Sequence, residues 1–276
     1  MNEDGSKQNI NSITFLGIGN AMCTRCYNTC FFLRSPQGGM LVDAGGGNGI
    51  FRQLHKAHIG FEEIRHIFVT HVHTDHILGV IWLIRKISPL IHKGKHPGLM
   101  IYCNAEVKHA IATICELLIP RKINRALGDT IILREITDGE LVLVDDMEMT
   151  CFDLGTTKTS QYGFSMLMPD GQTVVCLGDE PYYPRNEKYV SGCDWLLCEA
   201  FCLYKDREQF RPYDKHHSTA LDAGRQAEEL GVKHLVLYHT EDTTLATRKA
   251  AYTAEASIHF TGQALCPDEL ETVVLE

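Results

Sequence analysis

A run of six residues, His71-Val72-His73-Thr74-Asp75-His76, constrains the fold of this chain more than any other feature of the sequence. The apolar segment before it, 66–70, predicts a strand, and the pattern after it predicts a helix over 75–87. Four side chains that can bind a metal therefore leave one strand-to-helix turn. Imidazoles and a carboxylate suit zinc, and manganese or iron would also fit. The alternative, an aspartate that caps a helix beside three histidines in a polar loop, does not account for this density.

The remaining apolar segments fall into two successive blocks of strands and helices. Strands are predicted at 13–18, 30–33, 40–42, 66–70, 98–103, 131–136, 140–144, 147–154, 163–168, 173–177, 195–198, 234–238 and 269–275. Helices are predicted at 49–58, 75–87, 104–118, 219–231 and 244–256. We expect Ser88-Pro89 to end the second helix, Asn104 to cap the third, and Thr219 with Asp222 to form a capping box on the fourth. This order predicts an α/β fold, an αβ/βα four-layer sandwich of two mixed β-sheets flanked by helices.

Composition limits the class of protein further. The 276 residues carry 26 basic and 35 acidic side chains, a net charge of −9, which disfavours non-specific binding to nucleic acid. No apolar stretch is long enough to cross a membrane, so we expect no membrane partner. The odd count of 11 cysteines argues against a disulfide framework and favours a cytoplasmic location. We expect a polar N-terminal tail, residues 1–11, and a single domain over residues 12–276.

The histidine run resembles the His-x-His-x-Asp-His signature of the metallo-β-lactamase superfamily, and the resemblance extends from about Ile13 to Glu276. The other segments that carry it are Phe15-Leu16-Gly17, Leu41-Val42-Asp43-Ala44-Gly45-Gly46, Leu177-Gly178-Asp179 and Leu235-Val236-Leu237-Tyr238-His239. The resemblance implies two adjacent metal sites with a bridging carboxylate. The ligands that it implies in this chain are His71, His73, Asp75, His76, Asp179 and His239.

One ligand of the superfamily pattern is missing. A third histidine is expected shortly before the strand that contains Gly163, but the chain has no histidine between His109 and His216. The expected position falls at Gly155, Thr156 or Thr157, none of which is a good zinc ligand. We therefore predict one firmly bound metal at the second site, with Asp75, His76, Asp179 and His239, and a weak or empty first site.

A second pair of motifs resembles the RNase Z-like branch of the superfamily. Leu197-Cys198-Glu199-Ala200-Phe201 and His217-Ser218-Thr219-Ala220 imply that Glu199 orients His217, which donates a proton to the leaving group. His216 is an alternative to His217, and a histidine in an ordinary polar loop is the other interpretation. That branch carries a long tRNA-binding arm before its later acidic motif. Only 22 residues lie between Thr156 and Asp179, so tRNA is not the expected substrate.

Two further side chains are candidates for contact with substrate. Tyr182 follows the acidic motif at a position where related lactonases and esterases place an aromatic hydroxyl, which could donate to a developing oxyanion. Simple packing is the alternative for Tyr182. Lys158 could place an ammonium beside the position of the missing histidine, and a solvated loop charge is the alternative that we prefer.

A cysteine motif, Cys23-x-x-Cys26-x-x-x-Cys30, could also hold a metal. It has no partner pair at zinc-finger spacing, so plain buried or loop thiols are the preferred interpretation.

The sequence thus predicts a metal-dependent hydrolase in which a metal-activated water attacks a phosphodiester or related ester. Asp75, His217 and Glu199 are the expected catalytic residues, and the expected substrate is a small molecule or a short ester or phosphodiester. A lactonase or carboxylic-ester hydrolase is one alternative, and a catalytically silent binding protein of the same fold is another. Because members of the family often dimerise, a homodimer is an open alternative to a monomer.

Overall fold

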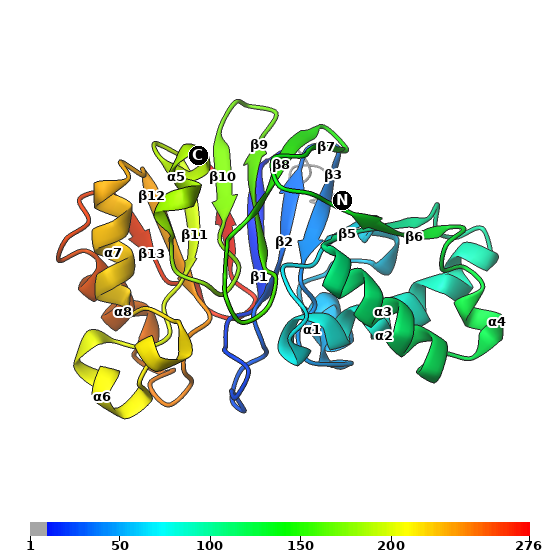
Figure 1. Cartoon of the computed structure of the whole chain (residues 1–276), viewed down its shortest axis with the longest axis horizontal. Coiled ribbons are helices and arrows are strands. Elements are labelled where there is room, and N and C mark those ends of the chain that lie inside the picture. The colour runs from blue at the N-terminus through cyan, green and yellow to red at the C-terminus, as the bar shows by residue number, and fades with distance from the viewer. Residues whose placement is uncertain (1–9) are drawn as a thin grey trace, which may run out of the picture.

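The computed structural model describes residues 10–276, so most of the predicted polar tail lies outside the described residues. Two seven-stranded sheets pack face to face, and helices cover both outer surfaces, as Figure 1 shows. The predicted αβ/βα sandwich is therefore confirmed. Among the described residues, no helix has the length and the apolar character that crossing a membrane requires.

The first sheet has the strand order β14-β1-β2-β3-β4-β5-β6, and helices α1 to α4 lie on its outer face. Its strands are β1 (Ser12–Gly17), β2 (Cys30–Ser35), β3 (Gly38–Val42), β4 (His66–Phe68), β5 (Leu99–Cys103), β6 (Ile131–Glu135) and β14 (Thr272–Val274). The helices are α1 (Gly49–Lys56), α2 (Thr74–His92), α3 (Ala105–Leu118) and α4 (Arg121–Asn124).

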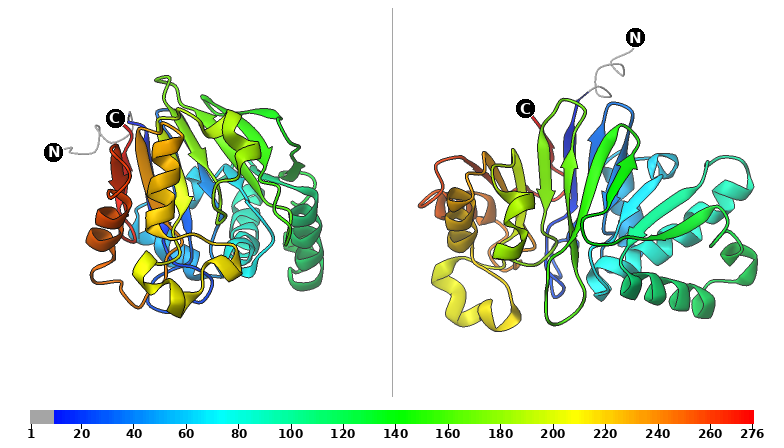
Figure 2. Two further views of the ribbon diagram at one scale, coloured as in Figure 1. Left: turned by 60° about the vertical axis from the view of Figure 1, so that its left-hand side comes forward. Right: turned by 45° about the horizontal axis from the view of Figure 1, so that its top comes forward.

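The second sheet has the order β13-β12-β11-β10-β9-β8-β7, and its outer face is covered by helices from the second half of the chain (Figure 2). Its strands are β7 (Leu141–Val144), β8 (Met147–Asp153), β9 (Tyr162–Leu167), β10 (Thr173–Cys176), β11 (Trp195–Glu199), β12 (His234–Tyr238) and β13 (Gln263–Leu265). The helices are α5 (Glu187–Val190), α6 (Arg207–Phe210), α7 (Ala220–Glu229) and α8 (Arg248–Ala256).

Three apolar clusters fill the spaces between these layers. The central one lies between the sheets and includes Phe31, Phe68, Phe164 and Trp195. The other two lie between each sheet and its helices. Burial of these faces is the main stabilisation of the sandwich, because apolar area removed from water contributes about 25 cal/mol per Å².

Parallel pairing brings the ends of distant strands to one edge of the sandwich. Strands β3, β4 and β5 run parallel in the first sheet, and β10, β11 and β12 run parallel in the second. Five side-chain positions lie at or just after the carboxyl ends of β3, β4, β10, β11 and β12: Asp43, the histidine run (which continues into α2), Asp179, Glu199 and His239. Loops from both sheets therefore supply one common site.

Two helix caps are confirmed, and two predicted helix ends are wrong. Asn104 accepts a hydrogen bond from the Val107 amide, and Thr219 and Asp222 form the expected capping box. Helix α2 runs through Pro89 to His92 instead of ending at Ser88-Pro89. Pro89 lies in the last turn, so its missing N–H removes a single intrahelical bond from a helix already nineteen residues long.

Helix α8 begins at Arg248 and not at residue 244. The carboxylate of Glu241 accepts hydrogen bonds from the amides of Thr243 and Thr244, which holds residues 241–244 as a turn. That turn satisfies backbone donors without helical geometry, and the helix starts four residues later than the periodicity predicts.

Candidate metal centre

The side chains of the histidine run lie close together in a cluster of histidines and aspartates, as the sequence predicts. His73 is the N-cap residue of α2, and Asp75 lies in the first turn of that helix. His71 is fully buried, and Nε2 of His71 lies 2.8 Å from Nδ1 of His73. Nε2 of His76 lies 3.3 Å from a carboxylate oxygen of Asp75.

Asp179 joins the two halves of the cluster. Its Oδ2 lies 3.5 Å from Nε2 of His71, 3.6 Å from Nε2 of His76 and 3.5 Å from Nε2 of His239. The donor atoms form overlapping groups, within 4.8 Å of one another: His71, His73 and Asp179; Asp75, His76 and His239; Asp179, His217 and His239. The structure therefore brings together all six residues that the resemblance implies as metal ligands.

The chemistry of this donor set fits a divalent metal. Nε2 of His76 is buried and has no hydrogen-bond partner among the described residues, although it faces the oxygens of Asp75 and Asp179. A buried donor atom without a partner costs free energy unless a ligand satisfies it. Burial also holds the pKa of His71 well below its usual value and lowers that of His239 to about 4, so both imidazoles are neutral at pH 7, as metal binding requires.

The two aspartates supply the negative charge. Burial alone would raise the pKa of Asp75, but the charge of His76 outweighs it and holds the pKa below the usual range. Asp179 is likewise buried, and the histidines around it, His71 first, hold its pKa well below the usual range. Both carboxylates are therefore ionised at neutral pH.

Asp43, which follows β3, contacts the cluster through His76 and also binds the neighbouring Thr70. Its Oδ2 lies 2.7 Å from Nδ1 of His76, and its Oδ1 accepts the amide of Thr70 at 2.9 Å. Burial disfavours the charged form of His76, yet the charges of Asp43 and Asp75 hold its pKa well above the usual value. Asp43 and His239 both adopt left-handed backbone conformations, with φ of 54° and 58°. Backbone strain of this kind concentrates at functional sites.

The segment with the missing histidine contributes a different side chain. Gly155, Thr156 and Thr157 lie in a loop on the surface, where Thr156 bonds to the carbonyl of Thr159. Gln161, immediately before β9, is the residue from this segment that contacts the cluster. Its Nε2 lies 3.1 Å from Nδ1 of His71 and donates to Asp179. Gln161 was not predicted from the sequence, since a lone glutamine before a strand carries no metal signature.

His217 lies beside the cluster with Glu199. Nδ1 of His217 is 3.5 Å from Oε2 of Glu199, and the other oxygen of Glu199 accepts the amide of Ser218. The His217 ring stacks on Phe201 at 4.9 Å and lies 5.4 Å from the ring of His239. Burial would lower the pKa of His217, but the adjacent Glu199 carboxylate raises it above the usual value.

The two candidate substrate-binding residues have no hydrogen bond to the cluster among the described contacts. Lys158 is exposed and donates to the Lys215 carbonyl at 2.8 Å, which links two loops of the second sheet. Tyr182 is half-buried and packs against the apolar layer under α7 and α8. The hydroxyl of its neighbour Tyr183 donates to Glu180 at 2.9 Å, and burial raises the pKa of Glu180, next to Asp179, to about 7. The roles of Lys158 and Tyr182 stay predictions.

Fold and site together define an RNase Z-like protein of the metallo-β-lactamase superfamily. Residues 11–255 match the profile of the family described as anti-Pycsar protein Apyc1, and the chain belongs to that family. Ribonuclease Z of Phocaeicola vulgatus is 25% identical over 292 residues, covering 87% of this chain and 91% of that protein.

Solved structures share the whole fold. The metallo-β-lactamase fold protein YhfI from Bacillus subtilis superposes with a TM-score of 0.77 at 18% identity, covering 96% of this chain and 100% of YhfI. The short form of human tRNase Z superposes with a TM-score of 0.75 at 21% identity, covering 96% of this chain and 99% of the human protein. The relatives named ribonuclease Z do not support the expectation that tRNA is excluded as a substrate.

Proposed function

We propose that this chain is a metal-dependent phosphodiesterase. The observation that carries the proposal is the convergence of His71, His73, Asp75, His76, Asp179 and His239 on one buried cluster, with the Glu199–His217 pair at its edge. The ribonuclease Z relatives support the same reaction class, because their named activity is the cleavage of RNA.

The cluster offers two overlapping positions for a divalent metal. Asp75, His76, Asp179 and His239 would hold the firmly bound ion, and His71, His73 and Asp179 would hold a weaker one. Zinc suits this set of imidazoles and carboxylates, and manganese or iron would also fit. A metal bound there would lower the pKa of a water toward neutrality and polarise the phosphoryl group.

The residues of the chain have separate tasks in this reaction. The ionised carboxylate of Asp75 would orient the attacking water and accept its hydrogen bond. Asp43 fixes the ring of His76 through Nδ1, so that Nε2 faces the cluster. The hydroxyl of Thr29, 3.2 Å from Nδ1 of His239, does the same for His239. Ligands held in this way need little reorganisation when substrate binds.

His217 would protonate the leaving oxygen. It lies within reach of Asp179 and His239, and its raised pKa favours the protonated form that a general acid needs. Phosphodiester cleavage leaves an alkoxide that gains most from such a proton. A lactone or carboxylic ester opens to a carboxylate and an alcohol at the same kind of site, so a lactonase is the second enzyme candidate.

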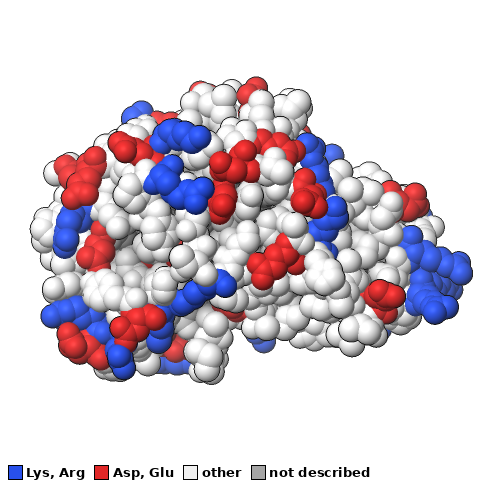
Figure 3. Space-filling model, in the orientation of Figure 1, with Lys and Arg blue, Asp and Glu red and all other residues white. Residues whose placement is uncertain are grey.

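The segment between Thr156 and Asp179 is only 22 residues long, which supports a small or short substrate in this proposal. Strands β9 and β10 are joined by a tight turn in which the Met168 amide donates to the carbonyl of Gln172 at 2.8 Å. Acidic and basic side chains are interspersed over the face in Figure 3, and basic ones gather at the tip formed by α4.

The match to the Apyc1 family supports an anti-Pycsar role for this activity.

A substrate panel tests the proposed function. The purified protein with Zn²⁺ or Mn²⁺ is assayed on bis-p-nitrophenyl phosphate, on aryl esters and lactones, and on a precursor tRNA. We expect hydrolysis of the phosphodiester. Activity confined to lactones or acyl esters would favour a lactonase. Cleavage of the precursor tRNA would show that the protein acts as a ribonuclease Z. Inactivity on all substrates with every metal would favour a catalytically silent binding protein.

A further inference from the structure

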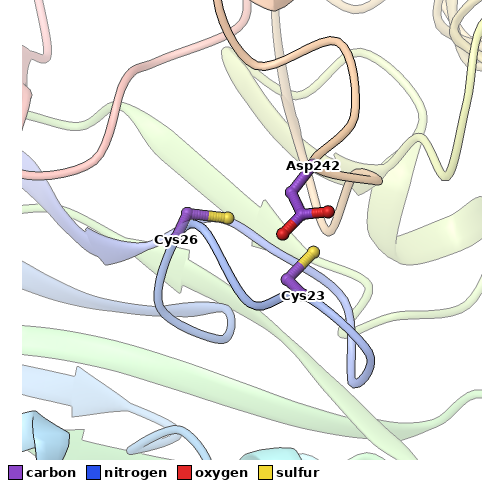
Figure 4. A group of neighbouring side chains, drawn as sticks. All are labelled: Cys23, Cys26 and Asp242. Atoms are coloured by element: carbon purple, nitrogen blue, oxygen red, sulfur yellow. The ribbon is translucent and has the colours of Figure 1, made fainter.

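A second group of potential metal ligands lies outside the histidine cluster. Cys23 and Cys26 lie in the loop between β1 and β2, and Asp242 lies in the loop after β12 (Figure 4). One ligand atom of each residue lies within 4.8 Å of the corresponding atoms of the other two. All three side chains are partly exposed, so an ion can enter from solvent.

The β1–β2 loop is shaped to bring the two thiols together. A Cβ atom added at Gly19 would lie 2.6 Å from Sγ of Cys26 and 2.7 Å from Sγ of Cys23. Both sulfurs therefore lie over the Cα of Gly19, and any larger residue there would force them away. Sγ of Cys23 also donates to the Thr240 carbonyl at 3.3 Å, which holds it against the second loop.

Asp242 is held in place by the cysteine loop itself. One oxygen, Oδ2, accepts the amides of Thr24 and Arg25, at 2.6 and 2.8 Å. These two residues separate Cys23 from Cys26, so the turn between the thiols fixes the carboxylate that faces them. The same Oδ2 is the only Asp242 side-chain atom with hydrogen bonds among the described contacts, which leaves Oδ1 available.

We propose that Cys23, Cys26 and Asp242 form a separate metal site for a thiophilic divalent cation such as Zn²⁺. Two cysteines with two residues between them have the spacing of zinc-binding pairs, and a carboxylate oxygen is an accepted third ligand. The fourth position is open to a water molecule. The sequence has no second cysteine pair at zinc-finger spacing to complete the site. The fold instead brings in Asp242, which lies 216 positions after Cys26.

Binding is a ligand exchange that needs no redox partner. Zn²⁺ displaces one proton from each thiol, forms two Zn–S bonds and one bond to the ionised carboxylate, and releases two protons to solvent. The bound ion would join the β1–β2 loop to the loop that begins with His239. Backbone contacts already link them, since Gly19 bridges to Thr240 and the Asn20 amide donates to the Thr240 carbonyl at 3.0 Å.

Cobalt spectroscopy on the whole chain tests this site without interference from the histidine cluster. The metal-free protein, kept reduced, is titrated with Co²⁺, and the thiolate-to-cobalt charge-transfer band in the near ultraviolet is followed. Only thiolate ligands give this band, and the histidine cluster contains none. We expect the amplitude of the band at saturation to correspond to one thiolate-bound Co²⁺ per chain in the wild type and in His71→Ala, whatever amount of Co²⁺ the histidine cluster takes up.

The variants make the outcome decisive. The band should be lost in Cys23→Ser/Cys26→Ser, together with one equivalent of bound Zn²⁺ per chain, and kept in Cys115→Ala, whose buried thiol lies on α3. Asp242→Asn keeps both thiols and should weaken Co²⁺ binding by at least about tenfold. A wild type without the band, a band that persists in the double variant, or unchanged affinity in Asp242→Asn would overturn the proposal. These readouts do not depend on phosphodiester hydrolysis, so failure of the proposed function would leave them intact.

Discussion

The carboxylate of Asp43 lies 2.7 Å from Nδ1 of His76, in a position where it holds the ring and makes Nε2 a better electron donor. Asp43→Asn should therefore weaken metal binding by about 10- to 100-fold, the usual cost of losing such a partner. Competition with a chromogenic chelator measures the affinity. Asp145→Asn is the matched control, because Asp145 faces His66 at 3.4 Å in another part of the protein. Equal metal affinity in Asp43→Asn and wild type would contradict the role of Asp43.

Glu199 and His217 predict a pH dependence of activity. The acid form of His217 is the active one, and its pKa is raised by Glu199, so activity should fall as pH rises through that pKa. Glu199→Gln removes the charge, lowers the pKa of His217 and should move this descending limb to lower pH. His216→Ala should leave the limb in place, because His216 is exposed and not part of the pair. A limb that Glu199→Gln does not move, or that His216→Ala does, would exclude His217 as the acid.

Gln161 lies beside His71 and Asp179, where an amide is a poor ligand for zinc. In the Cys23→Ser/Cys26→Ser background, which removes the proposed cysteine site, Gln161→His should raise the number of tightly bound metals from one to two per chain, because an imidazole would complete the His71, His73 and Asp179 group. Thr157→His, at one of the positions that the sequence pattern suggested, should leave the number unchanged. Metal analysis after gel filtration measures the number of bound metal ions per chain in both variants. Two tightly bound ions in Cys23→Ser/Cys26→Ser without the Gln161 change would refute the prediction of a single metal at the histidine cluster.

Arg248 is fully buried at the start of α8 and supports the loop that carries His239. Its Nε donates to the hydroxyl of Thr240 and its Nη1 to the Pro267 carbonyl, each at 2.7 Å. Arg248→Leu leaves both acceptors without a donor, and we expect a loss of roughly 2–4 kcal/mol in the free energy of unfolding. Urea denaturation measures it. Lys249→Leu, a half-exposed partner of Glu271, should cost less than about 1 kcal/mol, and equal losses in both variants would contradict the argument.

The sequence predicted much of the fold because local pattern and final structure agree along most of the chain. Alternating and continuous apolar segments indicated the long strands, and the caps at Asn104 and Thr219 are local hydrogen bonds that residue identity alone predicts. Strand β13 was not predicted, because three residues are too few to show a period. Helix α2 continues past its predicted end because Pro89 lies in its last turn. Helix α8 begins later than predicted because Glu241 holds the preceding residues in a turn. The spacing of apolar residues reveals neither feature.

The candidate site was likewise predicted only in part from the sequence. His71, His73, Asp75 and His76 form a contiguous motif, so their proximity follows from the sequence. Asp43 contacts His76, 33 positions away, because β3 and β4 pair in one sheet. Gln161 and Thr29 contact His71 and His239, 90 and 210 positions away, which only the packing of the two sheets brings close. Cys23 and Cys26 lacked a partner in the sequence for the same reason, since Asp242 reaches them from the far end of the chain.

Hydrolysis of bis-p-nitrophenyl phosphate by wild type and Asp75→Ala, each metal-free and then reloaded with Zn²⁺ or Mn²⁺, tests the central claim most directly. The account predicts that the wild type is inactive without metal and recovers on reloading, and that Asp75→Ala stays folded but loses at least about a hundredfold in rate, as loss of a group acting in the transition state implies. Phosphodiester hydrolysis that persists without metal, or at an unchanged rate in Asp75→Ala, would contradict it.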